Sequence, residues 1–205
     1  MRELVLVTHP EATHHVDGLV GGWYDADLTT RGLAQAEQVA EAVGSVGSVG
    51  QADAVFSSTL LRCRRTAEAI ATRVGVEVVL DPDMREQSYG VAGGHPPGTF
   101  PFVRAVRGDD LLRHHDGVEG SETRLDVATR IYRALERIEA AGHERTVVVG
   151  HGGASSYVVT AWLGMPLESV GPVRFAFASG SITRLREKDD GERSVQSLAD
   201  TAHLR

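Results

Sequence analysis

The chain contains a single cysteine, Cys63, among its 205 residues. One thiol excludes an intrachain disulfide and is typical of a protein in a reducing compartment. No apolar run approaches the roughly 18 residues that a membrane-spanning helix needs. The first residues, MRELVLVTH, also lack the apolar stretch and the cleavage site of a signal peptide. We therefore expect a cytoplasmic protein that has no membrane partner.

An excess of positive charge is also missing. The chain has 21 Lys and Arg against 28 Asp and Glu, which gives a net charge of −7. Because a face that follows a nucleic-acid backbone must be basic, we expect no nucleic-acid partner. A small anionic ligand remains compatible, since a pocket can be locally positive on an acidic protein. With 41% hydrophobic and 24% charged residues, the composition is that of an ordinary globular domain.

Short apolar runs alternate with helical patterns along the chain. Strands are predicted at 3–8, 52–56, 76–80 and 146–150, and helices at 30–43, 59–74, 121–141 and from the residue after Gly153 through Trp162. Two late strands, 173–178 and 181–186, are expected to form a hairpin through Ser179 and Gly180.

Local signals refine these elements. Ser57 and Ser58 are suitable caps for the helix at 59–74. The helix at 30–43 should bury one apolar face, made of Leu33, Ala36, Val39, Ala40 and Val43. The repeat GSVGSVG at 44–50 is interpreted as a flexible connection. Residues 81–120, rich in Pro, Gly and His, are expected to form an irregular insertion that contains one short helix and covers the site.

Strands that alternate with helices predict an α/β fold, here a three-layer sandwich of a mostly parallel sheet flanked by helices. The length fits a single domain over residues 1–205. Such sheets place their sites outside the carboxyl ends of the strands. His9 and His151 each follow a predicted buried strand directly. We therefore expect the two imidazoles to meet at one rim of the sheet.

These residue types suit the cleavage of a phosphate ester without a metal. The reaction needs a nucleophile, cationic donors for the phosphate oxygens and an acid for the leaving oxygen. A neutral imidazole is a nucleophile near neutral pH. Arg62 lies near the start of its predicted helix, where the N-terminal N–H groups also favour an anion. Glu86, in the irregular segment, could bring a carboxyl group into the pocket.

Five motifs in this order resemble the histidine phosphatase superfamily, in its phosphoglycerate-mutase-like branch. They extend over most of the chain and are specific as a set, although each is weak alone. They are LVLVTHPEAT at the N-terminus, the residues Asp27, Leu28, Thr29, Gly32, Gln35 and Ala36, and the segments SSTLLRCRRTAEAIA, MREQSYG and VVVGHGG.

The resemblance implies a metal-independent phosphatase that forms a phosphohistidine on His9. It implies that Arg62 and His151 hold the phosphoryl group and that Glu86 is the proton donor. The implied partner is a small phosphorylated metabolite, a phosphomonoester, and the implied enzyme needs no cofactor and no metal. Whether the chain forms a homodimer stays open.

The chain departs from the family pattern beside its nucleophile. The arginine that normally precedes the nucleophilic histidine is Thr8, and the glycine that follows it is Pro10. Loss of one charge-assisted contact should weaken phosphate binding by roughly 1.5–3 kcal/mol. Where the family often has an asparagine, this chain has His15. We hypothesise that His14 or His15 lends a donor that partly replaces the arginine.

Other functions stay open at this point. A phosphoglycerate-type mutase would return the phosphoryl group to the product, although the chain is shorter than typical mutases of this resemblance. Thr8 also motivates a noncatalytic phosphometabolite-binding protein, and a lyase or isomerase could use the same pocket.

Two rival phosphatase chemistries have weaker signals. Residues 25–29, DADLT, match the DxDxT motif of magnesium-dependent phosphatases, but the preceding GLVGGWY is a poor strand. A cysteine phosphatase needs an arginine six residues after its cysteine, and that position after Cys63 is Ala69. The histidines also lack the HxxxH or cysteine-rich spacing of a metal site.

Overall fold

The computed structural model describes residues 2–44 and 52–205. Its strands are β1 (Glu3–Thr8), β2 (Ala54–Ser58), β3 (Val78–Asp81), β4 (Arg145–Gly150), β5 (Ile182–Glu187) and β6 (Arg193–Asp200). Its helices are α1 (Thr13–Val16), α2 (Thr30–Gly44), α3 (Leu61–Val74), α4 (Arg124–Ala140) and α5 (Gly152–Trp162). Short 3-10 turns are η1 (Pro82–Met84), η2 (Gly90–Ala92), η3 (Leu167–Ser169) and η4 (Ala202–Leu204). Within the described part of the chain, no helix has the length and apolar character needed to cross a membrane.

The strands form one six-stranded sheet in the order β3-β2-β4-β1-β5-β6. The first four strands of this order run parallel, and β5 and β6 add an antiparallel edge. The expected α/β fold with a mostly parallel sheet is confirmed. In the register of β1 and β4, Thr8 lies opposite Gly150, so the next residues, His9 and His151, leave adjacent strands side by side.

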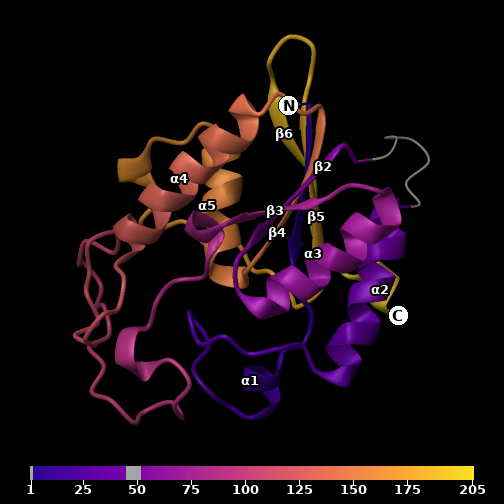
Figure 1. Ribbon diagram of the computed structural model, residues 1–205. Coiled ribbons are helices and arrows are strands. Elements are labelled where there is room, and N and C mark those ends of the chain that lie inside the picture. The colour runs from indigo at the N-terminus through magenta and orange to yellow at the C-terminus, as the bar shows by residue number, and fades with distance from the viewer. Residues whose placement is uncertain (1, 45–51) are drawn as a thin grey trace.

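Helices cover both faces of the sheet (Figure 1). In β1, Leu4 and Leu6 pack into the apolar cluster beneath α4 and α5, whereas Val5 and Val7 pack into the cluster beneath α2 and α3. This alternation follows from the two-residue period of a strand. A strand with apolar residues on both faces is buried between layers, which fixes its carboxyl end in place.

Helix α2 turns a different face to the core from the one expected. Ala36, Val39, Ala40 and Val43 are buried as predicted, but Leu33 is 46% exposed. Gly32 takes the inward position instead, and a Cβ atom there would lie 1.9 Å from the Glu11 carbonyl oxygen. The segment that follows β1 therefore packs directly against Gly32, and this contact turns Gly32 rather than Leu33 toward the core.

The second strand is shifted relative to its prediction. It runs from Ala54 to Ser58 rather than over 52–56, and Ser57 and Ser58 pair with Leu80 and Asp81 of β3. The two serines are therefore strand residues, and their prediction as helix caps is wrong. The residue that precedes α3 is Leu60, which makes no side-chain capping bond.

The C-terminal hairpin also differs from its prediction. Residues 173–178 form no strand, and β5 pairs instead with β6 (Arg193–Asp200). Ser156 of α5 holds the extended segment at Phe175, donating to its carbonyl oxygen and accepting from its N–H. The N–H and C=O groups of Phe175 therefore bond to a helix side chain and are not used in hydrogen bonds to a neighbouring strand.

The segment 81–120 contains no α-helix; its only helical turns are η1 and η2. The short helix expected there is replaced by these 3-10 turns, and the rest of the segment is irregular, as predicted. The segment lies at the end of the sheet where β1 and β4 finish (Figure 1). Residues 45–51, which include most of the GSVGSVG repeat, lie outside the described residues.

Candidate active site

His9 and His151 meet at the carboxyl ends of β1 and β4. Their ring centroids are 5.2 Å apart and their planes make an angle of 69°. His9 is 6% exposed and His151 is fully buried. The expected meeting of two imidazoles that are distant in sequence is therefore present, and it follows from the pairing of two neighbouring parallel strands.

The hydrogen bonds of His9 fix its tautomer. Its Nδ1 lies 2.8 Å from the carbonyl oxygen of Pro10, which can only accept, so Nδ1 carries the proton. The Arg62 Nε–H group donates to His9 Nε2 over 3.2 Å, so Nε2 presents its lone pair. Burial, and then the charge of Arg62, lower the pKa of His9 well below its ordinary value. The ring is therefore neutral near pH 7, as a nucleophile must be.

His151 lies beneath the site and is held by two side chains. Its Nε2 is 2.8 Å from the Ser58 hydroxyl oxygen and 3.3 Å from the Cys63 sulfur. Burial, followed by the charge of Arg62, lowers the pKa of His151 well below its ordinary value. Burial also raises the pKa of Cys63 to about 12, so this sulfur is a neutral thiol. Cys63 thus supports His151 and is no nucleophile.

Arg62 is the cation of the site. It lies in the first turn of α3 and is only 1% exposed. Besides its contact with His9, its two terminal nitrogens donate to the carbonyl oxygens of Tyr24 and Gly22 over 2.8 and 2.7 Å. These bonds fix the plane of the guanidinium and also hold the loop around Gly22 against the site.

His14 and His15 of α1 add two more rings. His15 is exposed and stacks on His9, with centroids 5.6 Å apart and an interplanar angle of 14°. Its Nδ1 accepts from the N–H of Ala12, so in the neutral ring Nε2 carries the proton and is a donor. His14 is buried, and burial lowers its pKa to about 4. Thr8 is buried at the end of β1, and its hydroxyl has no partner among the described residues.

A cavity of about 240 Å³ lies over these groups. Its lining includes all but one of the predicted site residues: Thr8, His9, His14, His15, Arg62 and Glu86. His151 does not line the cavity and lies behind His9. In residues 2–44 and 52–205, no group of three or more His, Cys, Asp or Glu side chains could hold a metal ion.

Glu86 joins the irregular segment to the start of α5. Its carboxylate accepts the N–H groups of Gly153 and Ala154 over 2.8 and 2.9 Å, and also that of Gln87. A carboxylate is favoured at a helix N-terminus, where N–H groups have no partner in the helix. A Cβ atom at position 153 would lie 2.5 Å from a Glu86 oxygen, so a larger residue there would displace the carboxylate from the helix N-terminus.

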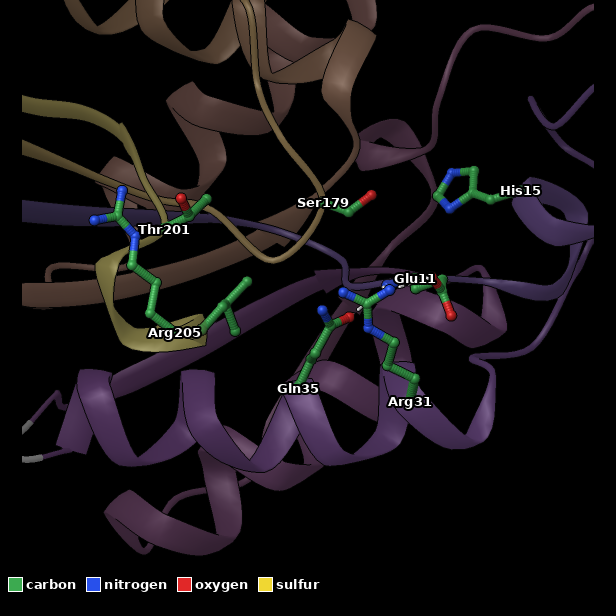
Figure 2. Close-up of a pocket in the computed structure, with 8 residues that line it drawn as sticks. Glu11, His15, Arg31, Gln35, Ser179, Thr201 and Arg205 are labelled. Carbon is green, nitrogen blue, oxygen red and sulfur yellow. Dashed lines mark hydrogen bonds and ion pairs between the residues drawn. The ribbon is translucent and has the colours of Figure 1, made fainter.

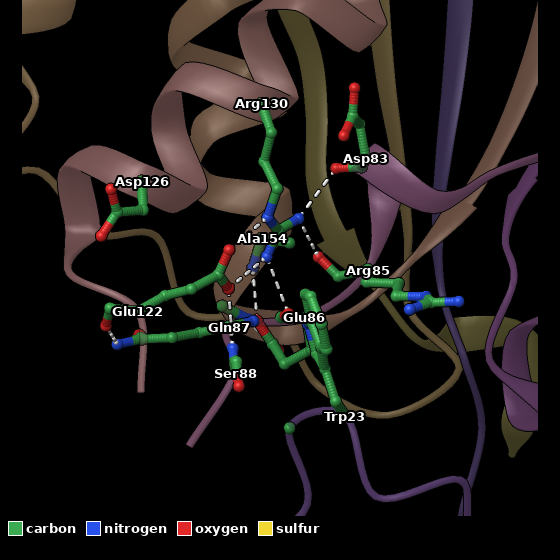
Figure 3. Close-up of polar contacts among 12 residues, drawn as sticks. Trp23, Asp83, Arg85, Glu86, Gln87, Ser88, Glu122, Asp126, Arg130 and Ala154 are labelled. Carbon is green, nitrogen blue, oxygen red and sulfur yellow. Dashed lines mark hydrogen bonds and ion pairs between the residues drawn. The ribbon is translucent and has the colours of Figure 1, made fainter. Parts of the chain in front are cut away.

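Arg130 of α4 supports the turn that carries Glu86, and the sequence prediction missed it (Figure 3). Its guanidinium donates to the carbonyl oxygens of Asp83, Arg85 and Glu86 over 2.6–2.8 Å. It also forms a bidentate pair with Glu122, at 2.8 Å for both contacts. The one available signal was an arginine on the apolar face of a predicted helix.

The residues of the rival DxDxT motif do not follow a strand. Asp25 and Asp27 lie in the loop before α2. Asp25 accepts the N–H of Leu61 at the start of α3, and Asp27 pairs with Arg65 over 3.3 Å. Both carboxylates therefore have structural partners, and neither lines the cavity over His9.

The sequence profile described as "Histidine phosphatase superfamily (branch 1)" matches residues 4–201. The chain belongs to this superfamily. The probable phosphoglycerate mutase GpmB of Proteus mirabilis is 32% identical to it over 211 residues, covering all of this chain and 95% of the relative.

Solved structures share the superfamily fold. Mycobacterial glucosyl-3-phosphoglycerate phosphatase in complex with VO3 has a TM-score of 0.77 and 24% identity, covering 98% of this chain and all of that one. The α-ribazole phosphatase of Shigella flexneri has a TM-score of 0.76 and 22% identity, covering 97% and 96%. At these identities the likeness concerns the fold.

The buried neutral histidines of this superfamily member predict a loss of stability in acid. His9, His14 and His151 have lowered pKa values when folded, so below pH 6.5 the unfolded chain binds more protons. The free energy of unfolding should therefore fall between pH 6.5 and 5 by up to about 1.4 kcal/mol per histidine per pH unit. Urea unfolding at several pH values measures this slope. His14→Phe should reduce it, and an unchanged slope in that variant would contradict the argument.

The Arg130 network predicts a second effect on stability. Arg130→Gln removes one donor from each of three carbonyl oxygens and breaks the buried ion pair with Glu122. The Glu86 carbonyl keeps the Trp23 N–H and Glu122 keeps the Ser88 N–H, but the loss should still lower the free energy of unfolding by about 3 kcal/mol. The matched control is Arg137→Gln on the same helix, whose half-exposed side chain pairs with Asp81 and Asp83. That change should cost less than about 1 kcal/mol. Denaturant unfolding of both variants checks the difference, and equal losses would exclude a special role for Arg130.

Proposed function

We propose that this protein is a metal-independent phosphatase that hydrolyses small phosphomonoesters through a phosphohistidine. The observation that carries the proposal is the state of His9. Its Nδ1 proton is fixed on the Pro10 carbonyl, and its Nε2 lone pair lies beside a buried guanidinium at the floor of a cavity. A neutral imidazole beside a fixed cation is suited to attack an anionic phosphorus centre.

In the proposed first step, the Arg62 Nε–H group releases His9 Nε2, and this nitrogen attacks phosphorus while the bond between phosphorus and the ester oxygen breaks. Arg62 holds the transferring group, and the carboxyl group of Glu86 gives a proton to the departing oxygen. The buried His151 does not reach the cavity in this structure and supports the ring of His9, against which it lies. In the second step, water attacks the phosphohistidine, Glu86 takes a proton from it, and inorganic phosphate leaves. Glu86 then starts each step in the protonation state that the previous step left.

His15 is proposed to replace part of the missing arginine at Thr8. Its Nδ1 accepts from the Ala12 N–H, so Nε2–H is available to donate to a phosphate oxygen. The ring lines the cavity and stacks on the nucleophile. His14 is the less favoured candidate, because its ring is buried against Gly21.

The names of similar proteins support this chemistry. The mycobacterial and Shigella proteins are named as phosphatases, and the mycobacterial structure was solved with VO3. A second candidate function is phosphoryl transfer back to the product, which the name of the Proteus relative, probable phosphoglycerate mutase, favours. The two functions share the first step and differ in whether water or the product accepts the phosphoryl group.

The nucleophile can be tested by trapping. After a short incubation with 32P-labelled phosphoglycerate in EDTA, an alkaline quench should leave label on the wild-type chain, because phosphohistidine survives alkali. His9→Ala should remove the label and lower turnover at least about a thousandfold. His143→Ala is the control, since this histidine lies at the opposite end of β4. Labelling of His9→Ala would exclude the mechanism, and isomerised phosphoglycerate in place of free phosphate would favour the mutase.

The role of Glu86 can be tested with two leaving groups. Glu86→Gln should lower kcat about a hundredfold or more for glycerol 3-phosphate, whose alkoxide needs a proton. For p-nitrophenyl phosphate the loss should be below about tenfold, because p-nitrophenolate departs without one. Steady-state kinetics on both esters gives the comparison. Equal losses on both would mean that Glu86 only caps α5.

A further inference from the structure

A second, larger cavity adjoins the one over His9 (Figure 2). It has a volume of about 490 Å³ and lies between the first turns of α2 and the C-terminal turn η4. We call it the α2 cavity, and its polar lining is Glu11, His15, Arg31, Gln35, Ser179 and Thr201, together with Arg205. Neither the resemblance nor the comparisons assign it a role.

The two cavities are connected. His15 and Ser179 line both of them. Ser179 lies in a loop fixed next to the nucleophile, because the following Gly180 N–H donates to the carbonyl oxygens of Thr8 and His9 over 3.0 and 3.1 Å. A molecule with its phosphate over His9 can therefore extend past His15 and Ser179 into the α2 cavity.

The α2 cavity offers mostly donors. The Arg31 side chain is 74% exposed and spends one terminal nitrogen on Glu11 over 3.4 Å, which leaves the rest of its guanidinium free to bind. Glu11, the one carboxylate side chain in the lining, is paired with Arg31 and also accepts the Thr29 hydroxyl over 2.7 Å. Gln35 uses its oxygen on the Glu11 N–H, so its NH₂ group remains as a donor.

Such a wall matches an anion better than a neutral sugar hydroxyl. A guanidinium binds carboxylate and phosphate oxygens in its plane, and an amide NH₂ adds a directed donor. The neighbouring hydroxyls of Ser179 and Thr201 can also donate. A neutral polyol would use the hydroxyls and the amide but would offer no anionic acceptor to the guanidinium nitrogens of Arg31 that Glu11 does not bind.

We propose that the α2 cavity binds a second anionic group, a carboxylate or a phosphate, on the part of the substrate that leaves. The inference rests on the proposed phosphatase function and names its substrate class. The protein would then prefer phosphomonoesters that carry two anionic ends over those with a neutral remainder.

Two pairs of substrates test whether the second anionic group is a carboxylate or a phosphate. Glycerol 3-phosphate and 3-phosphoglycerate differ by a carboxylate, and fructose 6-phosphate and fructose 1,6-bisphosphate differ by a phosphate. The wild type should show a kcat/KM at least about tenfold higher for the doubly anionic member of one pair, as expected for one charged contact. The pair that shows the preference identifies the anion.

Arg31→Gln should remove this preference by raising KM about tenfold for the doubly anionic ester, with KM for its partner unchanged. Gln35→Glu keeps an acceptor for the Glu11 N–H but puts a carboxylate in the wall of the cavity. Because this carboxylate repels the second anionic group, the variant should raise KM for the doubly anionic ester by more than Arg31→Gln does. Arg64→Gln is the matched control, because Arg64 lines neither cavity and pairs on α3 with Glu68.

The outcomes separate the two proposals. Equal kcat/KM within both pairs in the wild type, or an equal rise in both KM values in Arg31→Gln and Gln35→Glu, would overturn the anion cavity. If the wild type hydrolyses no ester, p-nitrophenyl phosphate included, the phosphatase proposal fails. In that case calorimetry measures the dissociation constants of the two members of each ester pair, and their ratio tests the anion cavity without turnover. Inorganic phosphate is the reference ligand, because it needs only the His9 cavity.

Discussion

The contact between the Arg62 guanidinium and the His9 imidazole is the interaction on which the site depends. It presents a permanent cation to the lone pair of His9 Nε2 at the floor of the cavity. Burial, followed by the charge of Arg62, lowers the pKa values of His9 and His151 and keeps both rings neutral. The same guanidinium binds the carbonyl oxygens of Gly22 and Tyr24, so it both shapes the wall of the cavity and contributes to the neutral state of His9.

The site is assembled from both layers of helices. Arg62 comes from α3, on one face of the sheet, whereas Glu86 is held by α5 and by Arg130 of α4, on the other face. The sheet between them contributes only the ends of its strands. A cation and a carboxylate from opposite layers therefore line the same cavity as His9. The proposed mechanism uses them separately, the cation for the phosphoryl group and the carboxyl group for the leaving oxygen.

Much of this arrangement could be predicted because its causes are local or topological. The apolar strands before His9 and His151 are visible in sequence, and parallel pairing brings their ends together. Arg130 could not be placed, because its carbonyl partners lie 44–47 residues away and leave no periodic signal. The failed hairpin has the same origin: a backbone bond from Gly180 to the end of β1 is a long-range contact that no turn signal reveals.

The register of β1 and β4 has a consequence for how this protein can change. Thr8 faces Gly150, so the spacing of His9 and His151 is inherited from the distance between neighbouring strands, about 4.8 Å. The residues that surround the α2 cavity belong to helices α1 and α2, to two loops and to the C-terminal turn, and none of them belongs to β1 or β4. Substitutions there can therefore retune which molecules are accepted while the reacting atoms keep their separation.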